Sequence, residues 1–383
     1  MALPDANWNY PTAIRFGAGR VAELGEACRA VGIGRPLLVT DPVLAEMPMV
    51  RKALAATGAG LFCAIHSNPV GGDVEAGLAA WRDGGHDGVI AFGGGSALDV
   101  GKVIAFMSGQ TRPLWDFEDK EDWWSRADPA GIAPVVAVPT TAGTGSEVGR
   151  AGVILDESEG VKKIIFHPKM LPAIVILDPE LTLGLPPHVT AATGMDALSH
   201  CLEAYCAPGF HPMADGIAAE GARLIRTWLP RAFEDGADVE ARGHMLVAAS
   251  MGATAFQKGL GGMHALSHPI GALHGTHHGL TNAVLMPYVL AYNRGAVEQR
   301  LARLAGYIGL AEASFAGLLA WVLALRQSLG IPHRLSELGV AEADIGRIAA
   351  MAEADPSAGG NPLRFDAAAA RAVLEAALAG RVA

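Results

Sequence analysis

Short apolar runs recur through the first 180 residues, and they restrict the fold of this chain more than any other feature. Five of them have the character of strands: residues 35–41, 61–65, 88–92, 134–140 and 173–178. Each is rich in Val, Ile or Leu. Helical patterns lie between several of these runs, for example at residues 73–83 and 97–107. Continuous apolar strands that alternate with helices predict a parallel sheet covered on both faces, which is an α/β fold.

The pattern changes near residue 185. Strand-like runs largely vanish after “LPPHVT” (185–190), and Ala- and Leu-rich helical patterning extends to the carboxyl end. We therefore predict two domains, an α/β domain over residues 1–184 and an all-helical domain over residues 185–383. Residues 108–133 are polar and contain Pro and Trp, and we expect them to form a surface loop.

The composition excludes several classes of protein. Hydrophobic residues make up 51% of the chain, which is too many for a disordered protein. The net charge of −10 and the lack of a long basic run argue against nucleic-acid binding. The first residues lack the pattern of a secretory signal, and the longest apolar runs are too short to span a bilayer. Four scattered cysteines without a CxxC pair suit a reducing compartment, so we expect a cytoplasmic protein with no membrane segment.

A glycine-rich loop follows one of the predicted strands, in “VIAFGGGSALDVGK” (89–102). Glycines let the backbone approach a phosphate, and the following helix offers unpaired N–H groups and the positive end of its dipole. Ser96 would cap this helix or donate to a phosphate, and Asp99 would fall in its first turn, where a carboxylate is favourable. The motif is neither G-x-G-x-x-G nor a Walker A loop, and a tight turn without a ligand is the alternative.

Other strand ends carry polar residues that suit a dinucleotide. Asp41 ends the first predicted strand, where it would accept hydrogen bonds from ribose hydroxyls and repel a 2′-phosphate. This position favours NAD over NADP, and the alternative role for Asp41 is a cap before Pro42. Thr, Gly and Ser cluster in “VPTTAGTGSE” (138–147), after a strand where ligand-binding loops of an open sheet gather. Asn68 follows another strand and is a weaker candidate.

Two pairs of potential metal ligands have helical spacing. Asp196 and His200 are four residues apart, so a carboxylate oxygen and an imidazole would lie on the same helix face. Taken alone, this pair is more simply an exposed polar pair. His264 and His268 repeat the spacing in “MHALSHPIGALHGTHHG” (263–279), which holds five of the thirteen histidines.

His278 joins these candidates only if the chain turns. It lies 14 residues after His264, which in a continuous helix would separate the two by roughly 21 Å. Two ligands of one ion need donor atoms about 3 Å apart, so a turn must come between them. Three glycines offer places for that turn: Gly271, Gly275 and Gly279. The spacing does not choose among the histidines, and we expect His274 and His277 to be ordinary surface residues.

Together these motifs resemble those of the iron-containing (group III) alcohol dehydrogenases. The matching segments are “FGAGR”, “GGGSALDVGK”, “PTTAGTGSE”, “DPELT”, “GMDALSH”, “GMHALSHPIGA”, “HHGLTNAVLMP” and “NPLRFD”. They span nearly the whole chain in the order of that family. The resemblance implies an NAD-binding α/β domain, a helical domain that carries the metal, and an active site in the cleft between them.

The resemblance also implies roles for particular residues. The metal ligands would be Asp196, His200, His264 and His278. His268 matches a histidine close to the nicotinamide, and we expect it to relay a proton. The cofactor-binding positions would be Asp41, Asn68, Gly94, Gly95, Ser96, Thr140, Thr141 and Thr144, with Lys163 as a further contact. Asp99 of the glycine loop completes the predicted set.

The predicted function is NAD-dependent, metal-dependent interconversion of a small primary alcohol and its aldehyde. Fe²⁺ is the expected metal, and three nitrogens with one oxygen also suit Zn²⁺. The alternative is a glycerol dehydrogenase or a dehydroquinate synthase-like enzyme of related architecture. A non-catalytic metal-binding protein is the rival of another class, and it would leave the glycine loop idle. We expect a homodimer or larger homo-oligomer that acts on a small molecule, with neither nucleic acid nor membrane as a partner.

Overall fold

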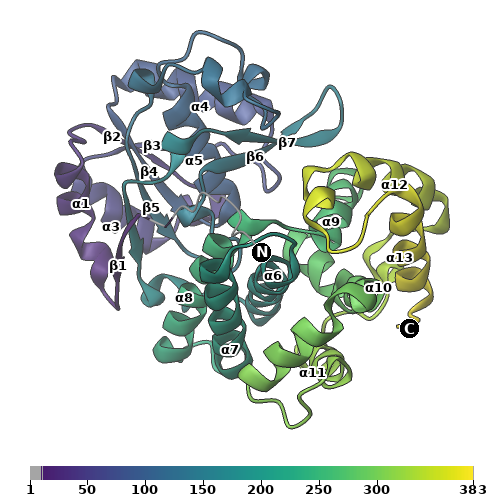
Figure 1. The fold of residues 1–383 in the computed structure, drawn as a ribbon. Coiled ribbons are helices and arrows are strands. Elements are labelled where there is room, and N and C mark those ends of the chain that lie inside the picture. The colour runs from purple at the N-terminus through teal and green to yellow at the C-terminus, as the bar shows by residue number, and fades with distance from the viewer. Residues whose placement is uncertain (1–9, 11, 383) are drawn as a thin grey trace. The chain divides into compact units, whose positions relative to one another are not determined.

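The computed structural model describes residue 10 and residues 12–382, which divide into two compact units (Figure 1). The first, here called the sheet unit, comprises residues 12–141 and 145–184. The second, here called the helical unit, comprises Tyr10, residues 142–144 and residues 185–382. The amino-terminal segment, where we expect no secretory signal, lies mostly outside the described residues.

The sheet unit is built on six parallel strands. Their spatial order is β1 (Ala13–Phe16), β8 (Ile174–Leu177), β5 (Val135–Pro139), β4 (Gly88–Gly93), β2 (Pro36–Val39) and β3 (Gly60–Phe62). All five predicted runs overlap a strand of this sheet, so the predicted α/β fold with a parallel sheet is confirmed. Only β1 escapes the prediction, because it is a largely exposed edge strand without the continuous apolar pattern.

Helices cover both faces of this sheet (Figure 1). They are α1 (Leu24–Ala30), α2 (Pro42–Ala45), α3 (Pro48–Thr57), α4 (Gly71–Gly84) and α5 (Gly95–Met107). Leu37 and Val39 of β2 pack with α4 and α5, whereas Leu38 between them packs with α1 and α3. Because successive strand residues face opposite sides, a sheet covered on both faces needs apolar residues at every position.

A second sheet in this unit is an antiparallel hairpin of β6 (Ala151–Asp156) and β7 (Val161–Phe166). Buried and half-buried positions alternate along both strands. The pattern in the sequence is therefore weaker than in the parallel strands, and the hairpin is not among the predicted elements.

The segment predicted as a surface loop, residues 108–133, is only partly one. It contains three short 3-10 helices, Leu114–Phe117, Trp123–Arg126 and Pro129–Gly131. Phe117 is 1% exposed and packs edge-on against Phe106 of α5. The prediction is wrong for this residue, because an aromatic side chain in a polar segment fills the core beneath the loop.

The described part of the helical unit consists of helices joined by loops and short 3-10 turns. The helices are α6 (Pro187–Cys206), α7 (Pro212–Glu234), α8 (Val239–Ala255), α9 (Gly262–His274), α10 (His278–Tyr307), α11 (Phe315–Ser328), α12 (Ile345–Ala354) and α13 (Ala367–Ala379). The predicted all-helical carboxyl-terminal part is thus observed. α6 packs against α7, α8 and α10 and is buried on nearly every side, which places its polar side chains inside the unit.

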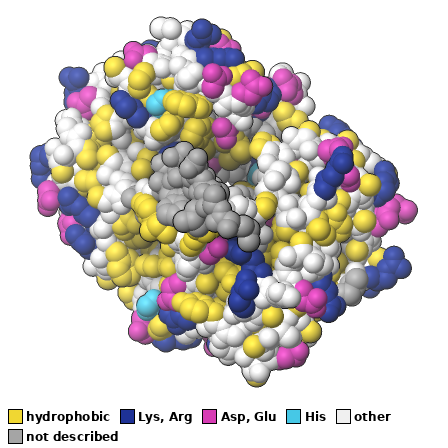
Figure 2. Space-filling view, viewed as in Figure 1, with side chains coloured by type: hydrophobic (Ala, Val, Ile, Leu, Met, Phe, Trp, Pro, Cys, Tyr) yellow, Lys and Arg dark blue, Asp and Glu magenta, His cyan; other side chains and the backbone are white. Residues whose placement is uncertain are grey.

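The surface carries both signs of charge. On the face shown in Figure 2, acidic and basic side chains are interspersed and neither sign forms a large continuous area. Within the described residues, no helix combines the length and the apolar character needed to cross a membrane.

Candidate metal centre and cofactor loops

Helix α6 presents the first two candidate ligands. Asp196 and His200 lie one turn apart on it and are 2% and 4% exposed. They face the start of α10, which approaches closely because Gly279 has no side chain. A Cβ atom at Gly279 would lie 2.8 Å from Cβ of Asp196 and 2.5 Å from the carbonyl oxygen of Ala192. This glycine therefore permits helix packing and is not the site of the predicted turn.

The turn between His264 and His278 lies at Gly275. This residue ends α9 with φ of 64°, a left-handed conformation that glycine adopts without strain. α10 begins three residues later, at His278. His264 is near the start of α9, and α9 continues through Pro269. The predicted break in the helix is therefore present, and it brings the two histidines together.

Four predicted ligands converge on one region of the helical unit. Ligand atoms of Asp196, His200 and His264 all lie within 4.8 Å of one another. Nε2 of His278 lies 3.7 Å from Oδ1 of Asp196. The amide nitrogen of Asn282 contacts three of the four, and it donates to Oδ1 of Asp196 at 2.9 Å. It also lies 3.2 Å from Nε2 of both His264 and His278.

The chemistry of this group fits a divalent cation. One carboxylate oxygen and two imidazole nitrogens, from Asp196, His200 and His264, form a compact donor set that suits a divalent metal ion. Burial lowers the pKa of His200 to about 4, so this imidazole is neutral at pH 7 and its lone pair is available.

His264 has a different electrostatic environment. Burial lowers its pKa, but the charge and hydrogen bond of Glu203 and the charge of Asp196 outweigh burial, so the pKa lies above its ordinary value. Nδ1 of His264 and Oε2 of Glu203 are 2.6 Å apart. Glu203 is absent from the predicted site, although its position three residues after His200 on α6 places both on one helix face.

His268 lies beside the candidate ligands but does not belong to their cluster. Its ring centroid is 5.9 Å from that of His264 and 5.4 Å from that of His278. Nδ1 contacts Oδ2 of Asp355 at 2.8 Å. The remaining two histidines of the stretch differ in exposure. His277 is exposed, as expected, whereas the expectation is wrong for His274, whose side chain is 19% exposed and whose Nε2 atom is buried. His277 caps α10 by accepting from the backbone of Leu280, and His274 lies 3.5 Å from Asp344.

The glycine loop joins β4 to α5 in the sheet unit. Gly93 has φ of 147°, and a Cβ there would lie 2.8 Å from that of Ala97, so only glycine fits. Gly94 is the N-cap of α5 and Gly95 its first residue. No side chain caps this end of α5, which leaves its first N–H groups open to an anion. Ser96 does not act as the cap, since its hydroxyl donates to the carbonyl of Ser67 at 2.6 Å.

Asp99 is not in the first turn of α5, because the helix begins at Gly95, two residues before the predicted start. Its carboxylate accepts from the hydroxyl of Ser146 at 2.5 Å and from the backbone N–H of Val153 at 3.1 Å. The ammonium of the fully buried Lys102 lies 3.3 Å from it. Asp99 therefore fixes the chain that leads from the Thr-rich loop into β6.

Asp41 takes its alternative role as a helix cap. Its Oδ1 atom accepts from the backbone N–H groups of Val43 and Leu44, both at 2.9 Å. Both bonds use the same oxygen, so this cap does not exclude a contact between Oδ2 and a ribose. Thr140 is buried at the end of β5, and Thr141 lies beside Gly94. Thr144 belongs to the helical unit.

The structure distinguishes two adjacent lysines of β7. Lys163, the predicted cofactor contact, forms ion pairs with Asp156 at 2.7 Å and Glu159 at 2.9 Å. Lys162 points to the other face of the strand, where its ammonium donates to Oδ1 of Asn68 at 3.0 Å. Burial lowers the pKa of Lys162. Lys162, rather than Lys163, thus lies beside a predicted cofactor residue, and the alternation of β7 accounts for the difference.

Comparison with known proteins agrees with this arrangement. Residues 11–179 match the family described as iron-containing alcohol dehydrogenase, and residues 190–378 match the carboxyl-terminal part of the Fe-containing alcohol dehydrogenase family. A 4-hydroxybutyrate dehydrogenase of Cupriavidus necator is 41% identical, over 96% of this chain and 98% of that protein.

Solved structures give the same result. A crystal structure of a 1,3-propanediol oxidoreductase is similar with a TM-score of 0.92 and 34% identity, over 97% of this chain and 100% of the other. A sulfoacetaldehyde reductase of Bifidobacterium kashiwanohense, in complex with NAD⁺, has a TM-score of 0.88 and 29% identity, over 97% and 99%.

The glycine loop at the N-terminus of α5 suits a phosphate, and the cluster of candidate ligands suits a cation. A metal-dependent dehydrogenase requires one site of each kind. The chain belongs to the iron-containing alcohol dehydrogenase family. It is an oxidoreductase that acts on a CH–OH group, and the family uses NAD and an iron ion. The predicted family, reaction class and cofactors are confirmed.

Proposed function

We propose that this enzyme oxidises a small primary alcohol to its aldehyde, reversibly, with Asp196, His200, His264 and His278 as the metal ligands. The observation that supports the assignment most strongly is the proximity of these side chains: ligand atoms of Asp196, His200 and His264 lie within 4.8 Å of one another, and Nε2 of His278 lies 3.7 Å from Asp196. A divalent cation held there would polarise the alcohol oxygen and favour loss of its proton, and NAD would accept the hydride.

The ligand set determines the charge of the centre. One carboxylate and three neutral imidazoles would leave a net charge of about +1 around a divalent ion, which favours a negatively charged oxygen. The low pKa of His200, about 4, supports a neutral imidazole at that position. Burial of Asp196, His200 and His264 keeps water away from three of the four ligands and strengthens their interaction with a cation.

The sheet unit is proposed to hold the cofactor. Seven of the contacts we assign belong to this unit, namely Asp41, Asn68, Gly94, Gly95, Ser96, Thr140 and Thr141, and the eighth, Thr144, belongs to the helical unit. The open N-terminus of α5 supports binding of a pyrophosphate, and Asp41 favours NAD over NADP because a carboxylate repels a 2′-phosphate. We assign the lysine contact to Lys162, since it lies at Asn68, and we give Asp99 the role of holding the loop.

His268 is proposed to relay the proton of the alcohol. Its Nδ1 atom faces Asp355, so Nε2 is the atom that can accept and release a proton. A carboxylate partner at Nδ1 stabilises the imidazolium that forms while the proton is held. Asp355 would thus fix the orientation and the tautomer of the relay without touching the substrate.

The proposal extends to the domains and the setting of the enzyme. Residues 1–184 would bind NAD, and residues 185–383 would hold the metal and carry out catalysis. All four cysteines are free thiols, which supports the cytoplasm as the location. Exposed Ile14 and Phe16 on the edge strand β1 support a homodimer or larger homo-oligomer, which light scattering would detect.

An anaerobic assay tests this function. Protein reconstituted with Fe²⁺ is mixed with NAD and a panel of alcohols that includes 4-hydroxybutyrate and 1,3-propanediol, and NADH absorbance is followed. A Zn²⁺-loaded sample and a metal-stripped sample run in parallel. We expect metal-dependent accumulation of NADH with at least one alcohol. Bound metal and bound NAD without net NADH from any alcohol would contradict the proposal and favour the dehydroquinate synthase-like alternative.

A further inference from the structure

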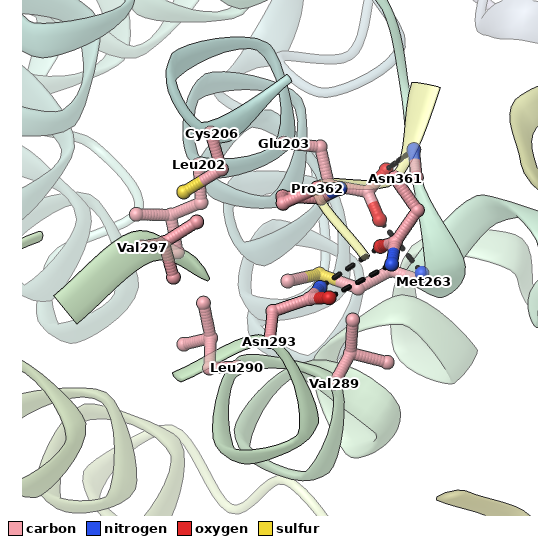
Figure 3. Close-up of a pocket in the computed structure, with 11 residues that line it drawn as sticks. Leu202, Glu203, Cys206, Met263, Val289, Leu290, Asn293, Val297, Asn361 and Pro362 are labelled. Atoms are coloured by element: carbon pink, nitrogen blue, oxygen red, sulfur yellow. Dashed lines mark hydrogen bonds between the residues drawn. The ribbon is translucent and has the colours of Figure 1, made fainter. Parts of the chain in front are cut away.

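Glu203 connects the candidate metal centre to the start of α9. It lies on α6, one turn beyond His200, and is 5% exposed. Its Oε2 atom accepts from the backbone N–H of Gly261 at 2.9 Å and lies 2.6 Å from Nδ1 of His264. Its Oε1 atom accepts from the backbone N–H of Met263 at 2.7 Å. Glu203 and Met263 face the same small buried pocket in Figure 3.

The backbone contacts explain how a carboxylate is tolerated in this interior. α9 begins at Gly262, so the N–H groups of Gly261 and Met263 belong to the end of the helix where the dipole is positive. Donors of this kind stabilise a negative charge without a neighbouring lysine or arginine. These two hydrogen bonds fix the position of the Glu203 side chain beside His264.

The contact with His264 decides which ring nitrogen carries the proton. A neutral imidazole has one N–H and one lone pair. A carboxylate only accepts hydrogen bonds, so Nδ1 of His264 must be the donor, and Nε2 holds the lone pair. Nε2 is also the atom that lies 3.2 Å from the amide nitrogen of Asn282, which donates to Asp196.

We propose that Glu203 is a positioning residue that fixes the tautomer and the ring orientation of His264 and thereby raises the affinity of the centre for a divalent cation. The proposal rests on the proposed role of His264 as a metal ligand. Partners of this type tune metal affinity by about 10- to 100-fold in metalloproteins generally.

A purely structural role is the competing explanation, because Glu203 also caps α9. The chain offers a matched control in Asn361. Its Oδ1 atom accepts from the backbone N–H of Gly262 at 3.1 Å, and its amide pairs with that of Asn293 through two bonds of 2.8 Å (Figure 3). Asn361 therefore caps the same helix end as Glu203, but the contacts described for it do not include His264.

The experiment compares Glu203→Gln with Asn361→Ala. Co²⁺ affinity is measured by competition with a chelator, and the visible absorption of bound Co²⁺ reports the ligand geometry. Thermal unfolding of the metal-free proteins measures the loss of capping. We expect both variants to lose thermal stability, but only Glu203→Gln to lose about tenfold or more in Co²⁺ affinity and to alter the spectrum. An equal loss of affinity in both variants, or an unchanged affinity in folded Glu203→Gln, would overturn the proposal.

A second measurement does not depend on a variant that must fold well. Nitrogen-15 NMR of histidine-labelled, Zn²⁺-loaded wild-type protein identifies the tautomer of His264, with His264→Gln used for assignment. The proposal predicts a protonated Nδ1 and a Zn²⁺-bound Nε2, and the opposite tautomer would contradict it. An error in the assignment of His264 as a metal ligand would give a different result. In that case His264→Ala would bind Co²⁺ as tightly as the wild type.

Discussion

Oδ2 of Asp355 lies 2.8 Å from Nδ1 of His268, and the other carboxylate oxygen accepts from the backbone N–H of Ser357 at 2.8 Å. Burial raises the pKa of Asp355. The charge and hydrogen bond of His268, together with hydrogen bonds from Ser357, lower it by more, so the pKa lies below its ordinary value. The carboxylate is therefore held ionised and oriented by its own chain. It gives His268 a fixed tautomer with Nε2 turned away from Asp355.

Replacing Asp355 with Asn should lower kcat about tenfold, because an uncharged amide stabilises an imidazolium poorly. Metal content should change little, because the hydrogen bond of Asp355 is with His268, which is not one of the proposed ligands. The matched control is Asp344→Asn. It removes a carboxylate that lies 3.5 Å from His274, a second histidine of α9, the helix that carries His268. Steady-state kinetics and metal analysis of both variants test the prediction. A kcat equal to that of the wild type in Asp355→Asn would show that Asp355 has no role in the proton relay.

Replacing His264 with Ala, or Asp196 with Asn, should reduce bound metal well below one ion per chain and lower kcat/KM by about a thousandfold or more. The physical reason is the loss of one of the four donors proposed to hold the cation. His277→Ala is the control, because His277 neighbours His278 in sequence, is exposed and caps α10. Full activity in His264→Ala would be incompatible with the assigned centre.

The two lysines of β7 make a paired test. Lys162→Met should raise KM for NAD about tenfold, because it removes the cation at Asn68 beside the proposed cofactor site. Lys163→Met should lower the melting temperature with little change in KM, because it breaks the ion pairs with Asp156 and Glu159. A raised KM for NAD in Lys163→Met, with an unchanged KM in Lys162→Met, would identify Lys163 as the cofactor contact.

Acid should weaken the same hairpin in a defined pH range. Hydrogen bonds from Lys163 and Ser158 outweigh burial and lower the pKa of Asp156 from 3.8 to about 2. Because the folded pKa is depressed, this carboxylate stabilises the protein fully above about pH 4, and the stabilisation is lost as pH falls towards 2. Asp156→Asn should therefore reduce the urea-unfolding free energy more at pH 6 than at pH 3. An equal reduction at both pH values would exclude this account.

Much of the fold can be predicted because the parallel strands are buried on both faces. Such strands need apolar residues at every position, as in “GVIAF” of β4, and the pattern is visible without knowledge of their neighbours. Edge strand β1 and the β6–β7 hairpin are different. Their side chains are partly exposed, and their existence depends on pairing with segments that the local sequence does not reveal.

The candidate site divides in the same way. Helical periodicity brings Asp196 next to His200, and the need for a turn after His264 follows from the length of a helix alone. Asp355 lies far in sequence from its partner His268, and Asn282 looks like an ordinary helix residue although it donates to Asp196. Only the packing of the folded chain identifies these two contacts. The choice between Lys162 and Lys163 depends on the register of β7, which a one-residue shift would reverse.

The most direct test of the metal centre is anomalous X-ray diffraction from crystals of the Zn²⁺-loaded enzyme, with data collected on both sides of the zinc edge. The account predicts one strong anomalous peak per chain, with Asp196, His200, His264 and His278 as ligands at about 2.0–2.2 Å. A peak bound elsewhere, or one that touches two or fewer of these side chains, would contradict it.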